Sequence, residues 1–333
     1  MVLDGNDPQA VAAAVRALAA GQLVGLPTET VYGLAADACN DAAVARIFAA
    51  KGRPADHPLI VHLAAAGDMD RFAAAVPPFA ARLAAAFWPG PLTLIVPRRP
   101  GIAAAAAGGQ DSVGLRCPAH PVAQAVLRAC VQAGVAGLAA PSANQFGRVS
   151  PTTAAHVQAE FGPELLVLDG GACAVGIEST IVDCTRGVPV LLRPGVLTRA
   201  EIAAAAGLPL ADRDAPDGAA PRASGTLEAH YAPRARLRLM DARALQAALD
   251  VLGSELDGKP ARIAVYARVV PRSRSAQLLR RRMPDDAAAA ARQLFAVLRD
   301  FDDQGATLIW VETPPADPAW DGVRDRLARA AAA

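Results

Sequence analysis

Apolar residues in the first two hundred positions recur with two different periods. Val11, Val15 and Leu18 lie three or four positions apart, the spacing of one helix face, and predict a helix over residues 8–21 that Gly21 ends. Short apolar runs with β-branched residues, such as 92–96, predict strands. Because helices and strands mix irregularly with several hairpin-like spacings, we expect an α/β domain with a twisted mixed sheet rather than a strict βαβ repeat.

The pattern bounds the elements of this first domain. We expect helices at residues 8–21, 42–50, 78–87, 121–134 and 152–161. We expect strands at residues 23–26, 59–63, 92–96, 112–116, 137–140, 165–169, 179–183 and 190–192. Asp41 directly precedes the second helix, and we expect its side chain to cap that helix.

The composition changes near residue 207. Residues 208–224 are rich in Pro, Asp, Gly and Ala and lack periodicity, which indicates a linker. The pattern then restarts as β-α-β-α-β-α, with strands at 236–240, 262–266 and 307–311 and helices at 242–252, 286–301 and 318–330. This order is typical of a small, parallel, Rossmann-like three-layer domain. We therefore expect domains at 1–206 and 234–333, joined by a linker at 207–233.

Composition and charge narrow the class of protein. The chain has 333 residues, 53% of them apolar, and a net charge of +1. This near-neutral charge argues against a protein that binds nucleic acid through its overall charge. It is compatible only with a local basic groove. The sequence shows no signal-peptide pattern, no membrane-length apolar run and five cysteines without a C-x-x-C pair. We expect a cytoplasmic protein with reduced thiols and no membrane contact.

Common catalytic motifs are missing from the sequence. It contains no P-loop, no H-E-x-x-H and no G-x-S-x-G. Instead, cations and hydroxyl groups gather at the ends of strand-like runs, a set that suits a polyphosphate plus a carboxylate. Taken one at a time, several of these polar residues also have a simpler structural interpretation. An isolated arginine such as Arg116 or Arg193 is typical of a solvated strand flank, Thr30 and Ser179 can bond their own turns, and His62 fits a core histidine.

Seven motifs occur in a fixed order along the chain. They are LPTETVYGL at 26–34, KGRP at 51–54, FWPGPLT at 87–93, VGLR at 113–116, PSAN at 141–144 with SPT at 150–152, IESTI at 177–181 and LRPG at 192–195. Together they resemble the threonylcarbamoyl-AMP synthases with a YrdC-like domain, over about residues 8–205. The sequence HYAP at 230–233 resembles the long form of that family, which adds a C-terminal domain.

The resemblance implies a nucleotidyl-transfer reaction. L-Threonine, bicarbonate or CO2, and ATP with Mg²⁺ would give L-threonylcarbamoyl-AMP and pyrophosphate. The product would supply the threonylcarbamoyl group for an adenosine beside the anticodon of tRNAs that read ANN codons, and other proteins would carry out that transfer. The resemblance assigns no protein ligand to the Mg²⁺, which would be held through the phosphates.

The resemblance also implies residue roles. The threonine pocket would consist of Thr30, His62, Arg116, the backbone of Ala140, and Ser179. The ATP side would consist of Lys51, Arg53, His57, Ser112, Ser142, Asn144, Ser150 and Arg193, with Tyr231 closing over the nucleotide from the linker. Lys51 and Arg53 would stabilise the departing pyrophosphate. A carbamate hydrolyses readily, so the linker is expected to act as a lid that excludes water.

Three parts of the sequence depart from the family pattern. His57 stands where the family commonly has asparagine, so its charge becomes pH-dependent. The linker has SGTL at 224–227 in place of SPGM, which affects the expected closing geometry. Gln145 and Phe146 interrupt a loop that is often smaller and more polar.

Two other functions compete with the synthase. A double-stranded RNA-binding or ribosome-associated module would bind through phosphate contacts, with steep salt dependence and no ATP turnover. A relative that makes carbamoyl-adenylate from carbamoyl phosphate would normally carry zinc-finger and acylphosphatase-like segments. The lack of paired cysteines argues against this second class.

Overall fold

The structure, a computed structural model, describes residues 1–212, 220–252, 263–269, 271–273, 275 and 278–333. The chain divides into two units with separate cores: a first unit of residues 1–146 and 150–226, and a second unit of residues 147–149 and 227–333. The change from one unit to the other at residue 226 falls within the predicted linker. Part of that linker, residues 213–219, lies outside the described residues.

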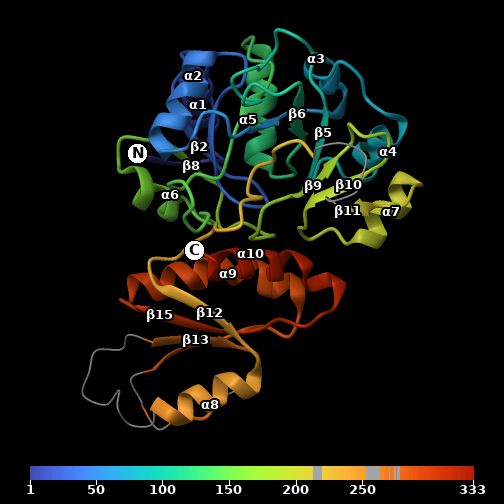
Figure 1. The fold of residues 1–333 in the computed structure, drawn as a ribbon. Helices are drawn as coiled ribbons and strands as arrows, with labels where there is room; N and C mark the ends of the chain where they lie inside the picture. The colour runs from blue at the N-terminus through green and yellow to red at the C-terminus, as the bar shows by residue number, and fades with distance from the viewer. Residues whose placement is uncertain (213–219, 253–262, 270, 274, 276–277) are drawn as a thin grey trace. The chain divides into compact units, whose positions relative to one another are not determined.

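The first unit combines one large sheet with short helices (Figure 1). Its helices are α1 (Pro8–Ala19), α2 (Asp41–Lys51), α3 (Met69–Phe72), α4 (Pro78–Phe87), α5 (Pro121–Gln132), α6 (Ala154–Phe161) and α7 (Arg199–Ala206), with a 3-10 turn η1 (Ala66–Asp68). Its strands are β1 (Val2–Asp4), β2 (Val24–Leu26), β3 (Gly33–Asp37), β4 (Ile60–His62), β5 (Leu92–Pro97), β6 (Ser112–Arg116), β7 (Leu138–Ala139), β8 (Leu166–Asp169), β9 (Thr180–Asp183), β10 (Val190–Arg193) and β11 (Ala211–Asp212).

The sheet is mixed, as the sequence pattern predicts. Its strand order is β1-β8-β2-β3-β7-β4-β6-β5-β9-β10-β11. Parallel pairs such as β4 with β6 and β5 with β9 alternate with antiparallel pairs such as β5 with β6. The strands β1, β3 and β11 were not expected. β3 consists of Gly, Leu, Ala, Ala and Asp, residues of low strand propensity apart from Leu34, so pairing with its neighbours defines it.

Local capping fixes the helix starts. Asp7 accepts a hydrogen bond from the backbone of Gln9 at the start of α1. The prediction that Asp41 caps α2 is wrong. Asn40 is the cap, its side-chain oxygen accepting from the backbone N–H of Ala43 at 3.1 Å, and Asp41 is the first helical residue, where its charge favours the helix dipole.

The two faces of this sheet are covered differently. One face packs on α2 and α4 through residues such as Leu34, Val61 and Leu115. The opposite face packs on α1 and α5 near β2, β7 and β8. Farther along this second face, Ile95 and Ile181 pack with Ala220 and Ala223 of the segment after β11, which covers the sheet there.

The second unit is a smaller parallel sheet, in agreement with the predicted Rossmann-like architecture. Its elements are β12 (Arg236–Met240), α8 (Ala242–Leu252), β13 (Ile263–Ala267), β14 (Leu279–Arg282), α9 (Ala287–Asp303), β15 (Leu308–Glu312), a 3-10 turn η2 (Pro318–Trp320) and α10 (Asp321–Ala331). The strand order is β12-β15-β13-β14, and all pairs are parallel. Helix α8 covers one face, and α9 with α10 cover the other (Figure 1).

Two details of this unit differ from the prediction. The helix expected at 318–330 begins as the turn η2 before α10, and the arginine-rich edge strand β14 was missed. Residue 262 of the predicted strand 262–266 lies outside the described residues. Within the described ranges, no helix has both the length and the apolar character that a bilayer crossing requires.

Candidate functional site

Strand alternation places one group of predicted residues on a single face of the large sheet. Val61 of β4 and Leu115 of β6 point into the core formed with α2 and α4. Ile60, His62 and Arg116 therefore project from the opposite face. The strands β4 and β6 are paired so that His62 lies beside Arg116. A cation and an imidazole thus come together on a floor of parallel strands.

Arg116 is the centre of this group. Its guanidinium is buried and donates to a Glu29 carboxylate oxygen at 2.7 Å and to the Thr30 hydroxyl at 2.8 Å. The Arg116 Nε donates to the Gly90 carbonyl at 3.3 Å. Thr30 in turn shares a 2.9 Å hydrogen bond with Thr28. Arg116 is therefore a paired, oriented cation and not a solvated strand flank.

Glu29 was not among the predicted site residues. It is the one acidic residue in the LPTETVYGL motif, and that position was the available signal. Its second carboxylate oxygen accepts from the backbone N–H of Ala119 at 3.1 Å. Both oxygens of this buried carboxylate are therefore engaged, and the charge of Arg116 is balanced inside the protein.

His62 is a neutral group in this site. Burial, and then the nearby charge of Arg116, lower the pKa of His62 to about 3. Its Nδ1 lies 3.3 Å from the carbonyl of Ile60. The predicted backbone position Ala140 adjoins this residue, because the N–H of Ala140 donates to the same Ile60 carbonyl at 3.0 Å.

Ser179 lies across strand β5 from this cluster. Its hydroxyl is 2.8 Å from that of Thr93. Arg193 donates to the Ser179 carbonyl at 2.9 and 3.1 Å and to the Ser179 hydroxyl at 3.2 Å. The structure thus brings Ser179, predicted to bind threonine, into direct contact with Arg193, predicted to bind ATP.

Lys51 organises the loop that follows β7. It is the last residue of α2, and Gly52 then takes the left-handed conformation, with φ of 60°, that ends the helix. The buried Lys51 ammonium donates to the carbonyl of Ser142 at 2.5 Å and to the carbonyl of Asn144. Burial, and then the charge of Arg53, lower the pKa of Lys51 to about 7.

Arg53, His57 and Phe146 form a second small group. The Arg53 guanidinium carbon lies 5.5 Å from the centroid of the Phe146 ring, and the His57 ring meets the same ring edge-on at 5.4 Å. Burial, and then Arg53, lower the pKa of His57. Phe146, which interrupts the usual loop, is thus the surface on which Arg53 and His57 rest.

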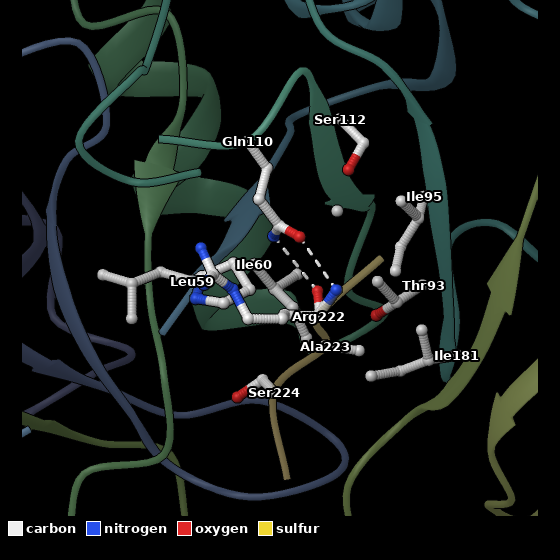
Figure 2. A pocket seen from close by; sticks show the side chains of 12 residues that line it. Leu59, Ile60, Thr93, Ile95, Gln110, Ser112, Ile181, Arg222, Ala223 and Ser224 are labelled. Atoms are coloured by element: carbon white, nitrogen blue, oxygen red, sulfur yellow. Dashed lines mark hydrogen bonds between the residues drawn. The ribbon is translucent and has the colours of Figure 1, made fainter. Parts of the chain in front are cut away.

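Part of this sheet face lines a small cavity of about 20 Å³, room for about one water molecule, which opens to solvent. It is lined by Pro58, Leu59, Ile60, Thr93, Ile95, Gln110, Ser112, Gly114, Ile181, Arg222, Ala223 and Ser224. Figure 2 shows Arg222, Ala223 and Ser224 crossing this cavity as one of its walls. The predicted residue Ser112 lies on the opposite side of the opening. The cavity is apolar at its floor and polar at its rim, as sites for small molecules usually are.

The linker wall is held at two points. The side chain of Gln110 accepts from the backbone N–H of Arg222 at 2.8 Å and donates to its carbonyl at 3.2 Å (Figure 2). Ser224 accepts from Arg193 through its carbonyl at 2.9 Å and from Arg53 through its hydroxyl at 3.4 Å. Gln110 was missed from the sequence, since it lies in a loop outside every motif.

Ser150 and Tyr231, also predicted for the ATP side, have other contacts. The Ser150 hydroxyl is fully buried and bonded to the carboxylate of Glu178. Tyr231 belongs to the second unit, where its ring stacks on that of Phe295.

The geometry suits two kinds of ligand group. Arg116 beside the neutral His62 offers a charge-assisted contact to a carboxylate. Lys51, Arg53 and Arg193 offer three cations to a larger anion, and the cavity offers apolar contact to its remainder. In the part of the chain that the structure describes, no three His, Cys, Asp or Glu side chains gather as a metal-binding group.

Comparisons with known proteins cover the whole chain. The family model described as "Telomere recombination" matches residues 16–195, and the model described as "Threonylcarbamoyl-AMP synthase, C-terminal domain" matches residues 197–332. A threonylcarbamoyl-AMP synthase of Bacillus subtilis (strain 168) is 36% identical, over 99% of this chain and 94% of its own length.

Solved structures of Pyrococcus abyssi Sua5 match both units. The complex with L-threonine has a TM-score of 0.83 and 34% identity, over 96% of this chain and 94% of its own. A variant with one histidine and one tyrosine changed to alanine has a TM-score of 0.85 and 32% identity, over 99% and 96% of the two chains.

Glu29→Ala should destabilise the first unit strongly, because it leaves the Arg116 charge buried and unbalanced. We expect the free energy of unfolding, measured by urea denaturation, to fall by about 3–5 kcal/mol. The matched control is Asp212→Ala, which removes the exposed partner of Arg199 and should cost under about 1 kcal/mol. Equal losses of unfolding free energy in the two variants would mean that the buried pair stabilises the protein no more than the exposed pair does.

His62 should make stability depend on pH. The unfolded chain takes up a proton at this histidine as the pH falls below about 6.5, whereas the folded chain does so only near pH 3. The free energy of unfolding should therefore fall with decreasing pH, by up to about 1.4 kcal/mol per unit below 6.5 from this group. Urea titrations at pH 7.5, 6 and 5 should show a shallower pH slope for His62→Asn than for the unchanged protein. Identical slopes would contradict the neutral state of His62.

Proposed function

This chain belongs to the threonylcarbamoyl-AMP synthase family, and from that membership we propose that it joins L-threonine, bicarbonate or CO2, and ATP into L-threonylcarbamoyl-AMP and pyrophosphate. It is an enzyme of the transferase class, and the proposed reaction is the first step of threonylcarbamoyladenosine formation in tRNA. The observation that carries the proposal is a carboxylate-binding Arg116 beside His62 on one sheet face, together with Arg53 and Arg193, which both contact Ser224 in the wall of the cavity.

The first group suits threonine. We assign the amino-acid carboxylate to Arg116, which Glu29 and Thr30 already orient. The neutral His62 and the Ser179 hydroxyl supply hydrogen bonds for the remaining polar atoms, together with the backbone at Ala140. The P. abyssi relative has been crystallised with L-threonine, which supports the same substrate here.

The second group suits ATP. We assign the phosphates to Lys51, Arg53 and Arg193, and the rest of the nucleotide to the space beside Ser112 that would open when residues 222–224 move away. His57, Ser142, Asn144, Ser150 and Tyr231 are the further residues proposed on this side. Arg53 and Arg193, which contact Ser224, must give up these contacts to bind phosphate oxygens. ATP binding would therefore move the linker wall.

The proposed chemistry has two steps. The threonine amine forms a bond to the carbon of CO2 and loses a proton, which gives a carbamate. A carbamate oxygen then bonds to the α-phosphorus while the bond from that phosphorus to the bridging oxygen breaks and pyrophosphate leaves. Lys51 and Arg53 stabilise the charge that develops on the leaving group. After its Ser224 contacts have been exchanged for phosphate oxygens, the linker would close again over the carbamate and exclude water.

We propose that Mg²⁺ binds together with ATP, through the phosphate oxygens. When bound, it would neutralise part of the negative charge of the departing pyrophosphate. Lys51, Arg53 and Arg193 fit phosphate oxygens, and a metal held through those oxygens needs no cluster of protein ligands.

We expect the reaction to take place in the cytoplasm, with separate proteins that pass the threonylcarbamoyl group to tRNA. The RNA-binding alternative is not favoured, because the full-length relatives carry the synthase name.

Pyrophosphate release from ATP tests the activity directly. The purified chain should release pyrophosphate only when L-threonine and bicarbonate are both present, since the carbamate is the nucleophile. Each substrate alone, and L-serine in place of threonine, are the controls. Release from ATP alone would indicate a different nucleotide reaction, and no release from folded protein under any condition would reject the synthase.

Arg116→Ala should separate the two substrates. Loss of a charge-assisted hydrogen bond of about 1.5–3 kcal/mol corresponds to a rise in the KM for threonine of roughly 10- to 150-fold, with little change in the KM for ATP. Steady-state kinetics at saturating co-substrate would measure both constants, and circular dichroism would confirm that the variant is folded. A parallel rise of both constants would remove Arg116 from the threonine pocket.

A further inference from the structure

The side chain of Gln110 pairs with the linker backbone in both directions. Its carboxamide oxygen accepts from the Arg222 N–H at 2.8 Å, and its carboxamide nitrogen donates to the Arg222 carbonyl at 3.2 Å (Figure 2). Two strands of an antiparallel sheet exchange the same two hydrogen bonds at each hydrogen-bonded pair of residues. Gln110 therefore gives Arg222 the partners that a neighbouring strand would otherwise provide.

The linker needs such partners because it crosses the face of the sheet. Residues 220–226 form no strand, so no ladder satisfies their backbone N–H and carbonyl groups. Ala220 and Ala223 pack against Ile95 and Ile181, but two methyl groups bury little apolar surface. Polar side chains of the first unit must therefore supply much of the interaction that keeps residues 222–224 on the sheet face.

Gln110 is itself fixed just before β6. Its carbonyl accepts from the Arg98 Nε at 2.8 Å, and its N–H donates to the Ala107 carbonyl at 3.2 Å. The preceding turn packs tightly on the neighbouring loop: Gly108 has a φ of 61°, and a Cβ there would lie 2.6 Å from the Asp56 carbonyl oxygen. Because the backbone of Gln110 is already ordered, little conformational freedom is lost when its side chain binds the linker.

The side chain of Arg222 binds the same two loops less firmly. Its guanidinium lies 3.4 Å from the Asp56 carboxylate, and both of these side chains are more than half exposed. Exposed ion pairs between long side chains contribute little to stability. The guanidinium also donates to the Gly108 carbonyl at 3.1 Å, at the cost of ordering a long side chain. Gln110, which bonds the linker backbone itself, is accordingly the main contact at this end of the wall.

The two ends of the wall differ in their response to a nucleotide. Ser224 contacts Arg53 and Arg193, cations that the proposed function assigns to phosphate oxygens. Gln110 is uncharged, and the proposed function assigns it no contact with a ligand. Its bonds to Arg222 are therefore not exchanged for phosphate oxygens, and the free energy of breaking them adds to the cost of moving the wall.

We propose that Gln110 is a positioning residue that keeps residues 222–224 across the sheet face and thereby lowers the apparent affinity for ATP. The physical reason is that a ligand's affinity falls in proportion to the fraction of molecules whose site is open. The inference rests on the proposed function, which places the nucleotide where this wall now lies. It gives a residue outside all seven motifs control over substrate affinity without contact with the substrate.

Limited trypsin digestion of the ligand-free full chain measures the contact directly. Gln110→Ala removes both hydrogen bonds to Arg222 and should speed cleavage between Arg222 and Ala223 by at least about fivefold. Gln110→Glu keeps the acceptor, loses the donor and should also speed this cleavage. The matched control is Asp111→Ala, which changes the exposed neighbour of Gln110 and should leave the rate unchanged. Equal cleavage rates in all these proteins would overturn the proposal.

ATP binding tests the link to the substrate. Isothermal titration calorimetry with ATP and Mg²⁺, in the absence of threonine, should give a Kd about fivefold lower in Gln110→Ala and within about twofold of the parent value in Asp111→Ala. Faster cleavage with an unchanged Kd would mean that the wall does not compete with the nucleotide, and would overturn the proposal. Faster cleavage in a chain whose parent protein binds no ATP would instead reject the proposed function.

Discussion

The first unit depends on how it compensates its buried cations. Lys51, Arg116 and Arg193 are each almost inaccessible to water, and an unpaired charge in such a place would be prohibitive. The chain meets this requirement mainly with backbone carbonyls from irregular segments. Each cation therefore fixes a loop: Lys51 holds the segment after β7, and Arg193 holds the start of β9 together with the linker. The shape of the site follows from the placement of these charges.

The cations differ in what compensates them, and this difference bears on their roles. Arg116 is paired with a full carboxylate, so its charge is balanced before any ligand arrives. Lys51 donates to the carbonyls of Ser142 and Asn144, and Arg193 donates to the carbonyl of Ser224; a phosphate oxygen is a stronger acceptor than any of these carbonyls. These two cations are thus suited to a highly charged ligand. The balanced one is suited to orienting a small carboxylate without excess attraction for larger anions.

Much of this arrangement could be predicted from local sequence. The alternation of β4 and β6 places His62 and Arg116 on one face. The strand β3 could not be predicted, because small residues become a strand there only through their neighbours. The contact between Gln110 and Arg222 joins positions 112 residues apart. Pairings at that separation depend on tertiary structure, which local periodicity does not encode.

The contact of Ser224 with Arg53 and Arg193 has a thermodynamic consequence for the free enzyme. A tethered group that occupies a binding position acts as an intramolecular competitor, with an effective concentration in the millimolar range for a short flexible connection. Under the proposed assignment of ATP phosphates to Arg53 and Arg193, the apparent affinity for a nucleotide includes the work of displacing this serine. The length and stiffness of the connecting segment thereby become a means of tuning substrate affinity that changes no residue in contact with the substrate.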